Sequence, residues 1–343
     1  MTQKIDTGAA SAAHAVPRTM TAVMQRGYGG AEVLRLEDVP VPQPTPKQVL
    51  IRVAAAGLDR GVWHIMAGLP YLVRPMFGMR APRQPIPGSD VAGTVVALGT
   101  ETTGFAVGER VFGTAAGSFA EYAVADASTV TRIPAGVSFN DAAAIPVSGL
   151  TALEAVHTHG KVQSGHRVLV TGASGGVGGY AVQLAAAAGA AVVGVSSGAK
   201  ADLVRSLGAD RVIDYATTDV TTLPERYDVI IDVNGRLPVG RLMRILTPTG
   251  ALVIVGGEGG GRWTGGLQRQ FGARLRSVFS RRRLGFFIAS VSGAGLLELS
   301  RLVETGALRS TASTVRPLTA VRETIDDLTA GRIRGKAVFR VAD

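Results

Sequence analysis

A glycine-rich segment between two apolar runs is the part of this sequence whose residues suggest the clearest chemistry. The segment Gly172-Ala173-Ser174-Gly175-Gly176-Val177-Gly178 follows the β-branched run Arg167 to Thr171 and leads into the helical pattern Gly178 to Ala188. Glycine at 175 lets the backbone approach a diphosphate, whose charge a helix N-terminus stabilises, and Gly178 lets the helix pack closely on the strand. The G-x-x-G-x-x-G spacing is weak alone, but the strand before it and the helix after it strengthen it. We predict a dinucleotide site, rather than an ordinary turn, at Ser174, Gly175, Gly176, Val177 and Gly178.

The residues after the next predicted strand, Ala191 to Ser196, favour NADPH over NADH. A site selective for NADH carries Asp or Glu about 20 residues after the glycine segment, where it binds the ribose 2′-hydroxyl. Here Ser196 and Ser197 stand in that place, and Lys200 follows within one helical turn. A carboxylate would repel a 2′-phosphate, whereas hydroxyls and an ammonium would bind it. The alternative is that Ser197 caps a helix and Lys200 is solvated.

The elements that must position these residues change in character at residue 148. From there, apolar β-branched runs such as Asp228 to Asp232 and Ala251 to Val255 alternate with helical patterns. This alternation predicts a doubly wound α/β unit, a parallel sheet covered by helices on both faces. Before residue 148, short strands separated by proline clusters predict a β-rich, barrel-like or sandwich-like unit. Residues 311–343 return to a strand–helix–strand pattern.

Length and composition agree with two globular domains. The chain has 343 residues, and one domain typically uses about 150. It contains no cysteine, which excludes disulfides, iron–sulfur clusters, thiolate zinc sites and cysteine nucleophiles. The net charge of +10 comes from dispersed arginines, apart from the run Arg281-Arg282-Arg283, and aromatic residues make up only 5%. This distribution argues against a nucleic-acid partner.

Neither the N-terminal segment nor the longest apolar stretch reads as a targeting signal or a membrane span. Residues 1–18 hold no apolar run of the kind a signal peptide needs, and they predict a disordered tail. The longest apolar stretch, Leu284 to Leu297, is too short to span a bilayer. We expect a soluble, cytoplasmic protein without stable membrane insertion. The arginine-rich segment Gly261 to Arg283 could be a lid over an active site or a membrane-surface helix, although a solvated amphipathic helix beside the cleft is favoured.

Several further stretches resemble one known family. They are Gly88-Ser89-Asp90-Val91-Ala92-Gly93-Thr94-Val95, Val107-Gly108-Glu109-Arg110-Val111, Gly149-Leu150-Thr151-Ala152 and Gly331-Arg332-Ile333-Arg334-Gly335-Lys336-Ala337-Val338. With the glycine segment, they make residues 20–343 resemble the medium-chain dehydrogenase/reductase superfamily, above all its zinc-free quinone oxidoreductase-like branch. The resemblance implies a GroES-like catalytic domain at 19–147 and 293–343, and a Rossmann dinucleotide-binding domain at 148–292. It also implies a homodimer paired through a last strand at Phe286 to Ser290.

The same resemblance argues against a metal. Zinc-dependent members carry Gly-His-Glu where this chain has Gly88-Ser89-Asp90, and they carry cysteines that this chain lacks. Zinc prefers neutral imidazole and thiolate ligands, and the five histidines show no coherent ligand spacing. No metal site is predicted.

The resemblance also implies roles for individual residues. Related quinone oxidoreductases carry Asn and, five residues later, Tyr, at the positions of Asp59 and His64. Asp59 would accept a hydrogen bond from the carboxamide or a substrate hydroxyl, and His64 would donate a proton, unless His64 is a packed residue at the rim. Tyr215 would lie against the 2′-phosphate, and Asn234 would face the ribose region. Thr151, Val255, Gly256 and Gly257 would line the nicotinamide.

These features together predict an NADPH-dependent, zinc-free oxidoreductase that transfers hydride to a quinone or an α,β-unsaturated carbonyl. Two alternatives stay open. One is a metal-free alcohol or aldehyde dehydrogenase, and the other is a non-catalytic NADPH-binding sensor or accessory protein. The sequence does not identify the small-molecule substrate, because variable loops build the pocket.

Overall fold

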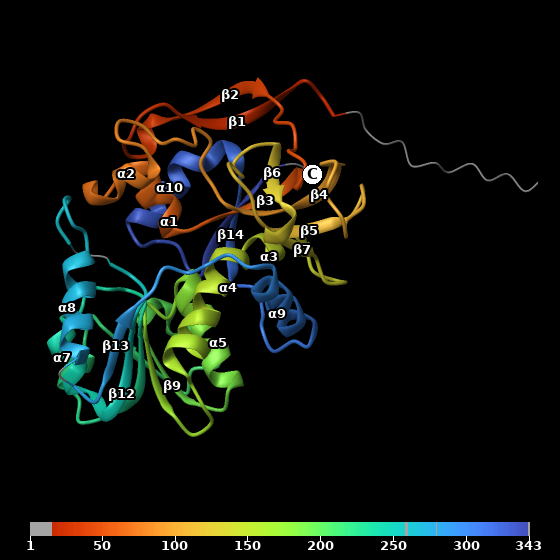
Figure 1. Cartoon of the computed structure of the whole chain (residues 1–343). Helices are drawn as coiled ribbons and strands as arrows, with labels where there is room; N and C mark the ends of the chain where they lie inside the picture. Colours follow the sequence, from red (N-terminus) through yellow and green to blue (C-terminus); the bar gives the residue numbers. More distant parts are fainter. Residues whose placement is uncertain (1–15, 258–259, 279, 342–343) are drawn as a thin grey trace, which may run out of the picture.

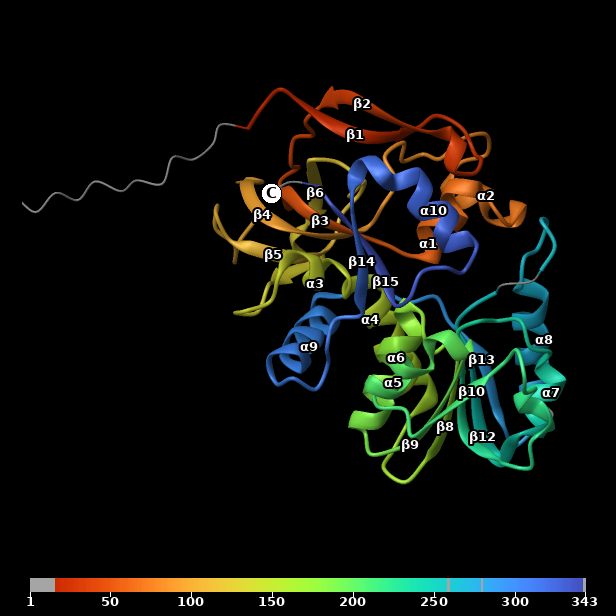
Figure 2. The same ribbon diagram turned by 180° about the vertical axis from the view of Figure 1, so that it is seen from behind.

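The computed structural model describes residues 16–257, 260–278 and 280–341 (Figure 1). Of the predicted tail, residues 1–15 lie outside the described residues, whereas the amide of Val41 donates a hydrogen bond to the carbonyl of Arg18 (3.1 Å). Figures 1 and 2 show two sheet-containing units with helix α4 (Pro146–Leu153) where they meet. No helix in the described part of the chain is long and apolar enough to cross a membrane.

A six-stranded parallel sheet forms the second unit, as the alternating pattern predicts. Its strand order is β10-β9-β8-β11-β12-β13, so the chain leaves β8 in one direction along the sheet and later returns to β8's other side. In open α/β sheets the ligand crevice lies at this switch point, outside the carboxyl ends of β8 and β11. The strands are β8 (Arg167–Thr171), β9 (Ala191–Ser196), β10 (Arg211–Asp214), β11 (Tyr227–Asp232), β12 (Leu246–Ile254) and β13 (Arg283–Phe286).

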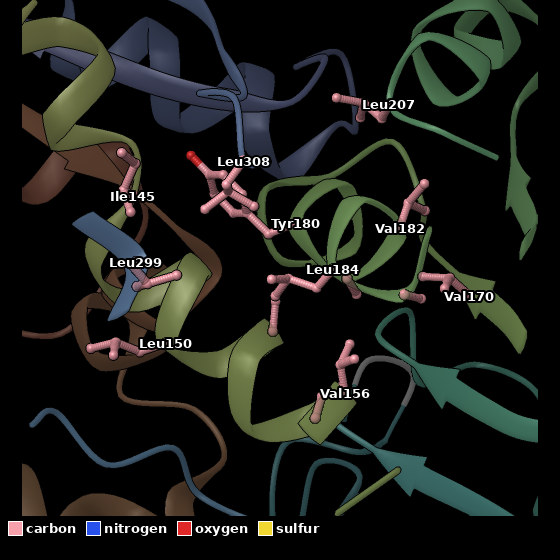
Figure 3. Close-up of a cluster of buried hydrophobic side chains, with 14 of the residues drawn as sticks. Ile145, Leu150, Val156, Val170, Tyr180, Val182, Leu184, Leu207, Leu299 and Leu308 are labelled. Carbon is pink, nitrogen blue, oxygen red and sulfur yellow. The ribbon is translucent and has the colours of Figure 1, made fainter. Parts of the chain in front are cut away.

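Helices cover both faces of this sheet because its strand residues are apolar on both sides. Val168 and Val170 of β8 pack toward α5 (Gly176–Ala187), while Leu169 between them belongs to the cluster on the face of α7 (Val239–Arg244) and α8 (Leu267–Val278). Figure 3 shows the first face, where Tyr180 and Leu184 of α5 lie in one cluster with Ile145, Leu150 and Leu299. The remaining helical segments of this unit are η4 (Glu154–Gly160), η5 (Gly198–Lys200), α6 (Ala201–Ser206) and η6 (Val220–Thr222).

The first unit is built on a seven-stranded, mostly antiparallel sheet and a two-stranded hairpin. Six of the strands follow the order β14-β15-β3-β4-β5-β7, with β6 paired to β3. The two C-terminal strands join this sheet because β15 pairs with β3, Ala337 lying opposite Leu58. The strands are β1 (Thr19–Gln25), β2 (Leu34–Pro40), β3 (Gln48–Leu58), β4 (Asp90–Leu98), β5 (Arg110–Thr114), β6 (Tyr122–Asp126), β7 (Val130–Arg132), β14 (Ala312–Pro317) and β15 (Lys336–Arg340). This is the GroES-like unit that the resemblance implies.

Short helices connect the strands of the first unit and pack it on the second. α10 runs between β14 and β15, and α9 packs against α4. The helical segments are η1 (Ala31–Val33), α1 (Arg60–Ala67), η2 (Tyr71–Val73), α2 (Arg74–Phe77), η3 (Ala127–Thr129), α3 (Phe139–Ala143), α9 (Gly293–Glu304), η7 (Leu318–Ala320) and α10 (Val321–Thr329).

The last strand of the parallel sheet begins earlier than the sequence predicts. We expected it at Phe286 to Ser290, but β13 ends at Phe286. Arg283 to Phe286 pair with Ala251 to Ile254 of β12, which buries Leu284. Ile288, in the centre of the expected strand, is 84% exposed. The apolar run therefore extends past the sheet, and the strand inferred from the family resemblance was placed too late.

Candidate cofactor and active site

The glycine segment forms a tight turn between β8 and α5. Gly175 is the N-cap residue of α5, with an extended backbone and no side-chain capping bond. Among the described residues, no backbone carbonyl accepts a hydrogen bond from the first-turn amides of Gly176, Val177 and Gly178. These three donors and the helix dipole fit a diphosphate group. A Cβ at position 178 would lie 2.1 Å from the carbonyl oxygen of Gly172, so only glycine permits this close turn.

The C-terminal segment of the first unit closes over this turn. The amide of Gly335 donates to the carbonyl of Ser174 (2.8 Å), and Gly175 forms a parallel bridge with Gly335. The ammonium of Lys200 donates to the carbonyls of Gly331 (2.9 Å) and Ile333 (2.6 Å). Residues 331–335 therefore join the glycine segment to the end of β9.

A basic pair lies beside the end of β9, where the sequence predicts the 2′-phosphate. Lys200 is half-buried and bonded to the C-terminal segment, whereas the alternative to a phosphate contact was a solvated side chain. Burial, reinforced by the positive charge of Arg334, lowers the pKa of Lys200. Two neighbouring cations repel one another, and a bound anion would stabilise both charges. Sequence reasoning missed Arg334, which lies more than a hundred residues from Lys200 along the chain.

The other residues predicted for this end of the cofactor lie at the carboxyl ends of β9 and β10. Ser196 is buried, its hydroxyl donates to the carbonyl of Ser197 (3.1 Å), and its carbonyl accepts from the amide of Tyr215 (3.1 Å). The Tyr215 side chain is 60% exposed. One acid, Asp214 at the end of β10, also lies here and accepts from the amide of Ala216 (2.9 Å).

Hydrogen bonds join the strand ends at the switch point, where a ligand crevice is expected. The Thr171 hydroxyl at the end of β8 donates to Asp232 at the end of β11 (2.6 Å) and accepts from the amide of Asn234 (3.2 Å). The amides of Val255 and Gly256 both donate to the carbonyl of Asp232 (3.0 and 3.2 Å). The structure thus brings Asn234, Val255 and Gly256 together, with Gly257 next in the chain. Thr151 comes from a different element, α4, where its hydroxyl donates to the carbonyl of Val147 (2.6 Å).

A buried ion pair attaches α8 to this crevice. Asp232 is fully buried and accepts a hydrogen bond from the guanidinium of Arg269, whose Nε also donates to the carbonyl of Leu237 (2.9 Å). Sequence reasoning did not identify this pair. The available signal was an acid that ends an otherwise apolar buried strand.

Between the two units lies a buried cluster around Lys336, the first residue of β15. Its Nζ is 2.7 Å from Asp90 Oδ2, 2.9 Å from Ser148 Oγ and 3.4 Å from Asp59 Oδ2. Asp90 also accepts from the amide of Val147 (2.9 Å). The cluster lies beneath the glycine segment, because a Cβ at Gly176 would be 2.9 Å from Ser148 Oγ and 3.2 Å from Lys336 Cδ.

The charges of this cluster depend on one another. Burial, together with the charge of Asp59, raises the pKa of Asp90 to about 6 despite the opposing effect of Lys336. Burial alone would lower the pKa of Lys336, but the facing carboxylates outweigh it and raise that pKa. The ammonium therefore stays charged, and it is the group that makes two buried carboxylates tolerable.

The two predicted catalytic residues lie at opposite ends of one short helix. Asp59 is the N-cap of α1 and accepts from the amide of Val62 (3.1 Å), in addition to its contact with Lys336. His64 lies in the last turn, half-buried, with its ring centroid 4.8 Å from that of Trp63. Asp59 is thus held in place by its surroundings, which suits an orienting group.

A segment that precedes α8 crosses to the first unit. The amide of Tyr71 donates to the carbonyl of Arg262 (2.8 Å), and the amide of Leu72 donates to that of Trp263 (3.1 Å). The rings of Tyr71 and Trp263 meet edge to face at 5.4 Å. Residues 261–266 therefore connect the two units on the side where Figures 1 and 2 show α2 and α8.

Comparisons with known proteins agree with this architecture. Residues 45–135 match the alcohol dehydrogenase GroES-like domain family, and residues 207–339 match a family described as zinc-binding dehydrogenase. A chloroplastic quinone oxidoreductase of Triphysaria versicolor is 32% identical over 337 residues, covering 94% of this chain and 98% of that protein.

Solved structures show the same similarity. A quinone oxidoreductase from Coxiella burnetii has a TM-score of 0.83 at 28% identity, covering 94% of this chain and all of that one. A mycobacterial protein solved in complex with NADPH has a TM-score of 0.79 at 26% identity, with coverage of 94% and 100%. The chain belongs to the medium-chain dehydrogenase/reductase superfamily and is an oxidoreductase of its quinone oxidoreductase-like branch.

Proposed function

We propose that this protein reduces a quinone or an α,β-unsaturated carbonyl with NADPH and without zinc. The observation that carries the proposal is the cofactor cradle: three first-turn amides, closed by a C-terminal segment that brings Arg334 to Lys200. Its similarity to proteins named as quinone oxidoreductases supports the substrate class. Steady-state oxidation of NADPH in the presence of quinones and enones tests the assignment.

Each part of the chain has a role in this proposal. Residues 148–292 form the dinucleotide-binding domain, and residues 19–147 with 293–343 form the catalytic domain. The edge strand β13 has one open side, and we propose that it pairs with a second copy of the chain. When bound, the cofactor supplies a hydride from the nicotinamide ring.

The side chains act around that hydride transfer. The amides of Gly176, Val177 and Gly178 hold the diphosphate, while Lys200 and Arg334 hold the 2′-phosphate. Tyr215 covers the adenosine, and Thr151, Asn234 and the 255–257 segment shape the nicotinamide pocket. Asp59 orients the carboxamide or the substrate, and His64 donates the proton that the resulting enolate takes up.

The basic pair gives the first prediction. Lys200→Ala and, separately, Arg334→Ala should raise the KM for NADPH about tenfold, because one charge-assisted hydrogen bond contributes about 1.5–3 kcal/mol. The KM for NADH should change little, since NADH lacks the 2′-phosphate. Lys47→Ala removes an exposed lysine elsewhere and serves as the control. Equal increases in the KM for both cofactors would mean that Lys200 and Arg334 only position the 331–335 segment. The prediction that the protein selects NADPH would then be wrong.

The side chains available as zinc ligands give the second prediction. The chain has no cysteine, and Asp90 is bonded to an ammonium that competes with any cation. Elemental analysis after dialysis should therefore find zinc far below one ion per chain, and the NADPH oxidation rate should be unchanged by a chelator. Finding about one zinc per chain, together with loss of activity in the chelator, would contradict the zinc-free assignment.

A further inference from the structure

Two segments from different units meet on one side of the molecule and form what we name the α2–α8 surface, residues 71–83 and 261–276. They are joined by the backbone hydrogen bonds of Tyr71 and Leu72 to Arg262 and Trp263. Both views of the chain show α2 and α8 on the same side (Figures 1 and 2). The surface lies near the switch point of the parallel sheet, where we expect the cofactor cleft, because Asp232 there holds α8 through Arg269.

Large apolar side chains project from this surface into solvent. A solvated amphipathic helix places polar residues on its outer face. α8 departs from this pattern: among its described side chains Ala273 is buried, whereas Phe271 and Leu275 are exposed beside Gln268, Arg274 and Arg276. The exposed apolar side chains are Leu72 (60%), Met76 (64%), Met79 (66%), Trp263 (74%), Phe271 (60%) and Leu275 (66%).

The charge of the α2–α8 surface has one sign. Its two segments, residues 71–83 and 261–276, contain seven arginines and no aspartate or glutamate. Arg80, Arg262 and Arg274 are exposed, and no carboxylate of the described residues forms a salt bridge with them. Some exposed arginines elsewhere in the described chain do pair, as Arg26 does with Glu37 (2.6 Å) and Arg211 with Glu225 (2.8 Å).

We propose that the α2–α8 surface docks on an anionic lipid bilayer. Tryptophan, phenylalanine and leucine side chains that enter the headgroup region, together with arginines that attract anionic lipids, are what an interfacial helix needs. A nucleic acid would match the arginines but would leave the leucine and methionine side chains in water. The attachment is peripheral, since no helix of the described residues could span a membrane. Docking would place the cleft beside the phase in which apolar quinones dissolve, a consequence that rests on the proposed function.

Flotation of the full-length protein with vesicles tests the docking itself, without cofactor or substrate. Vesicles of phosphatidylcholine containing phosphatidylglycerol should bind the protein at least tenfold more tightly than pure phosphatidylcholine vesicles, and salt should weaken the binding. The variant Phe271→Ser/Arg274→Gln/Leu275→Ser should lose at least tenfold in affinity. Its NADPH oxidation with a water-soluble quinone should match the wild type. The control Val107→Ser/Arg244→Gln/Leu297→Ser removes exposed residues of the same kinds outside the α2–α8 surface and should bind like the wild type.

Several results would overturn this inference. One is that the wild type does not bind anionic vesicles at all. Another is that the control variant loses as much vesicle affinity as the α8 variant, and a third is that the α8 variant binds vesicles as tightly as the wild type. Sedimentation of the same variants decides between a lipid and a protein partner. A shift of the α8 variant to a smaller oligomer, without vesicle binding by the wild type, would make this face a contact between copies of the chain. Salt-sensitive binding to an oligonucleotide, again without vesicle binding, would make it a nucleic-acid surface.

Discussion

Replacing Lys336 by methionine should destabilise the protein by about 3–5 kcal/mol, the usual effect of removing one partner from a buried ion pair. Methionine fills a similar volume but leaves Asp90 and Asp59 without the ammonium that faces them at 2.7 and 3.4 Å. Burial already raises the pKa of Asp90 to about 6 with the lysine present, so losing the lysine makes its negative charge still more costly. Urea denaturation at neutral pH, followed by circular dichroism, measures the change in the free energy of unfolding.

A second variant separates lost charge pairing from lost packing. Lys336→Met combined with Asp90→Asn should recover more than half of the lost stability, because the amide needs no counter-charge. Lys47→Met, at an exposed lysine, should have almost no effect. If the double variant were as unstable as Lys336→Met alone, packing rather than charge pairing would be the role of Lys336.

Replacing His64 by phenylalanine should lower kcat for an enone about 10²–10⁴-fold, the usual contribution of a general acid. After hydride reaches the β-carbon, the enolate must take a proton. In this chain His64 stands where related reductases carry tyrosine, in the last turn of the helix that Asp59 caps. NADPH affinity, measured by fluorescence titration, should stay unchanged because the proposed cofactor contacts lie elsewhere.

Two variants control this prediction. His157→Phe, an exposed histidine on η4, should keep the wild-type kcat. Asp59→Asn keeps a side-chain oxygen for Val62 and should raise KM more than it lowers kcat if Asp59 only orients groups. A His64→Phe enzyme with more than about a third of the wild-type kcat would show that solvent supplies the proton.

The fold could be predicted from local patterns because those patterns repeat with the period of the elements. β-branched runs alternating with helical segments gave the parallel sheet, and the glycine segment gave the turn between β8 and α5. The start of β13 could not be obtained this way, since Leu284 is buried by its pairing with Leu252, whereas the apolar residues after Phe286 extend past the sheet. Pairing along a sheet edge is a tertiary property.

The site was predictable where one segment builds it and not where distant segments meet. Lys336 and Asp90 are 246 residues apart, and each appeared in the sequence only within its own family motif, with nothing to indicate that the two meet. A charge that begins a buried strand implies an opposite charge elsewhere, but not which one. Arg334 reaches Lys200 for the same reason, because β15 returns to the first sheet and brings its preceding loop to the cofactor cradle.

The most direct test of the central proposal is the rate of NADPH oxidation by a panel of quinones, enones, aldehydes and alcohols, with chelator present throughout. The absorbance of the reduced nicotinamide follows turnover, and NADH with each substrate gives the cofactor preference. We predict turnover with at least one quinone or enone, a higher kcat/KM for NADPH than for NADH, and no alcohol oxidation. NADPH binding without turnover across the panel would indicate a sensor, and turnover confined to alcohols and aldehydes would indicate a metal-free alcohol dehydrogenase; either result would contradict the proposed reaction.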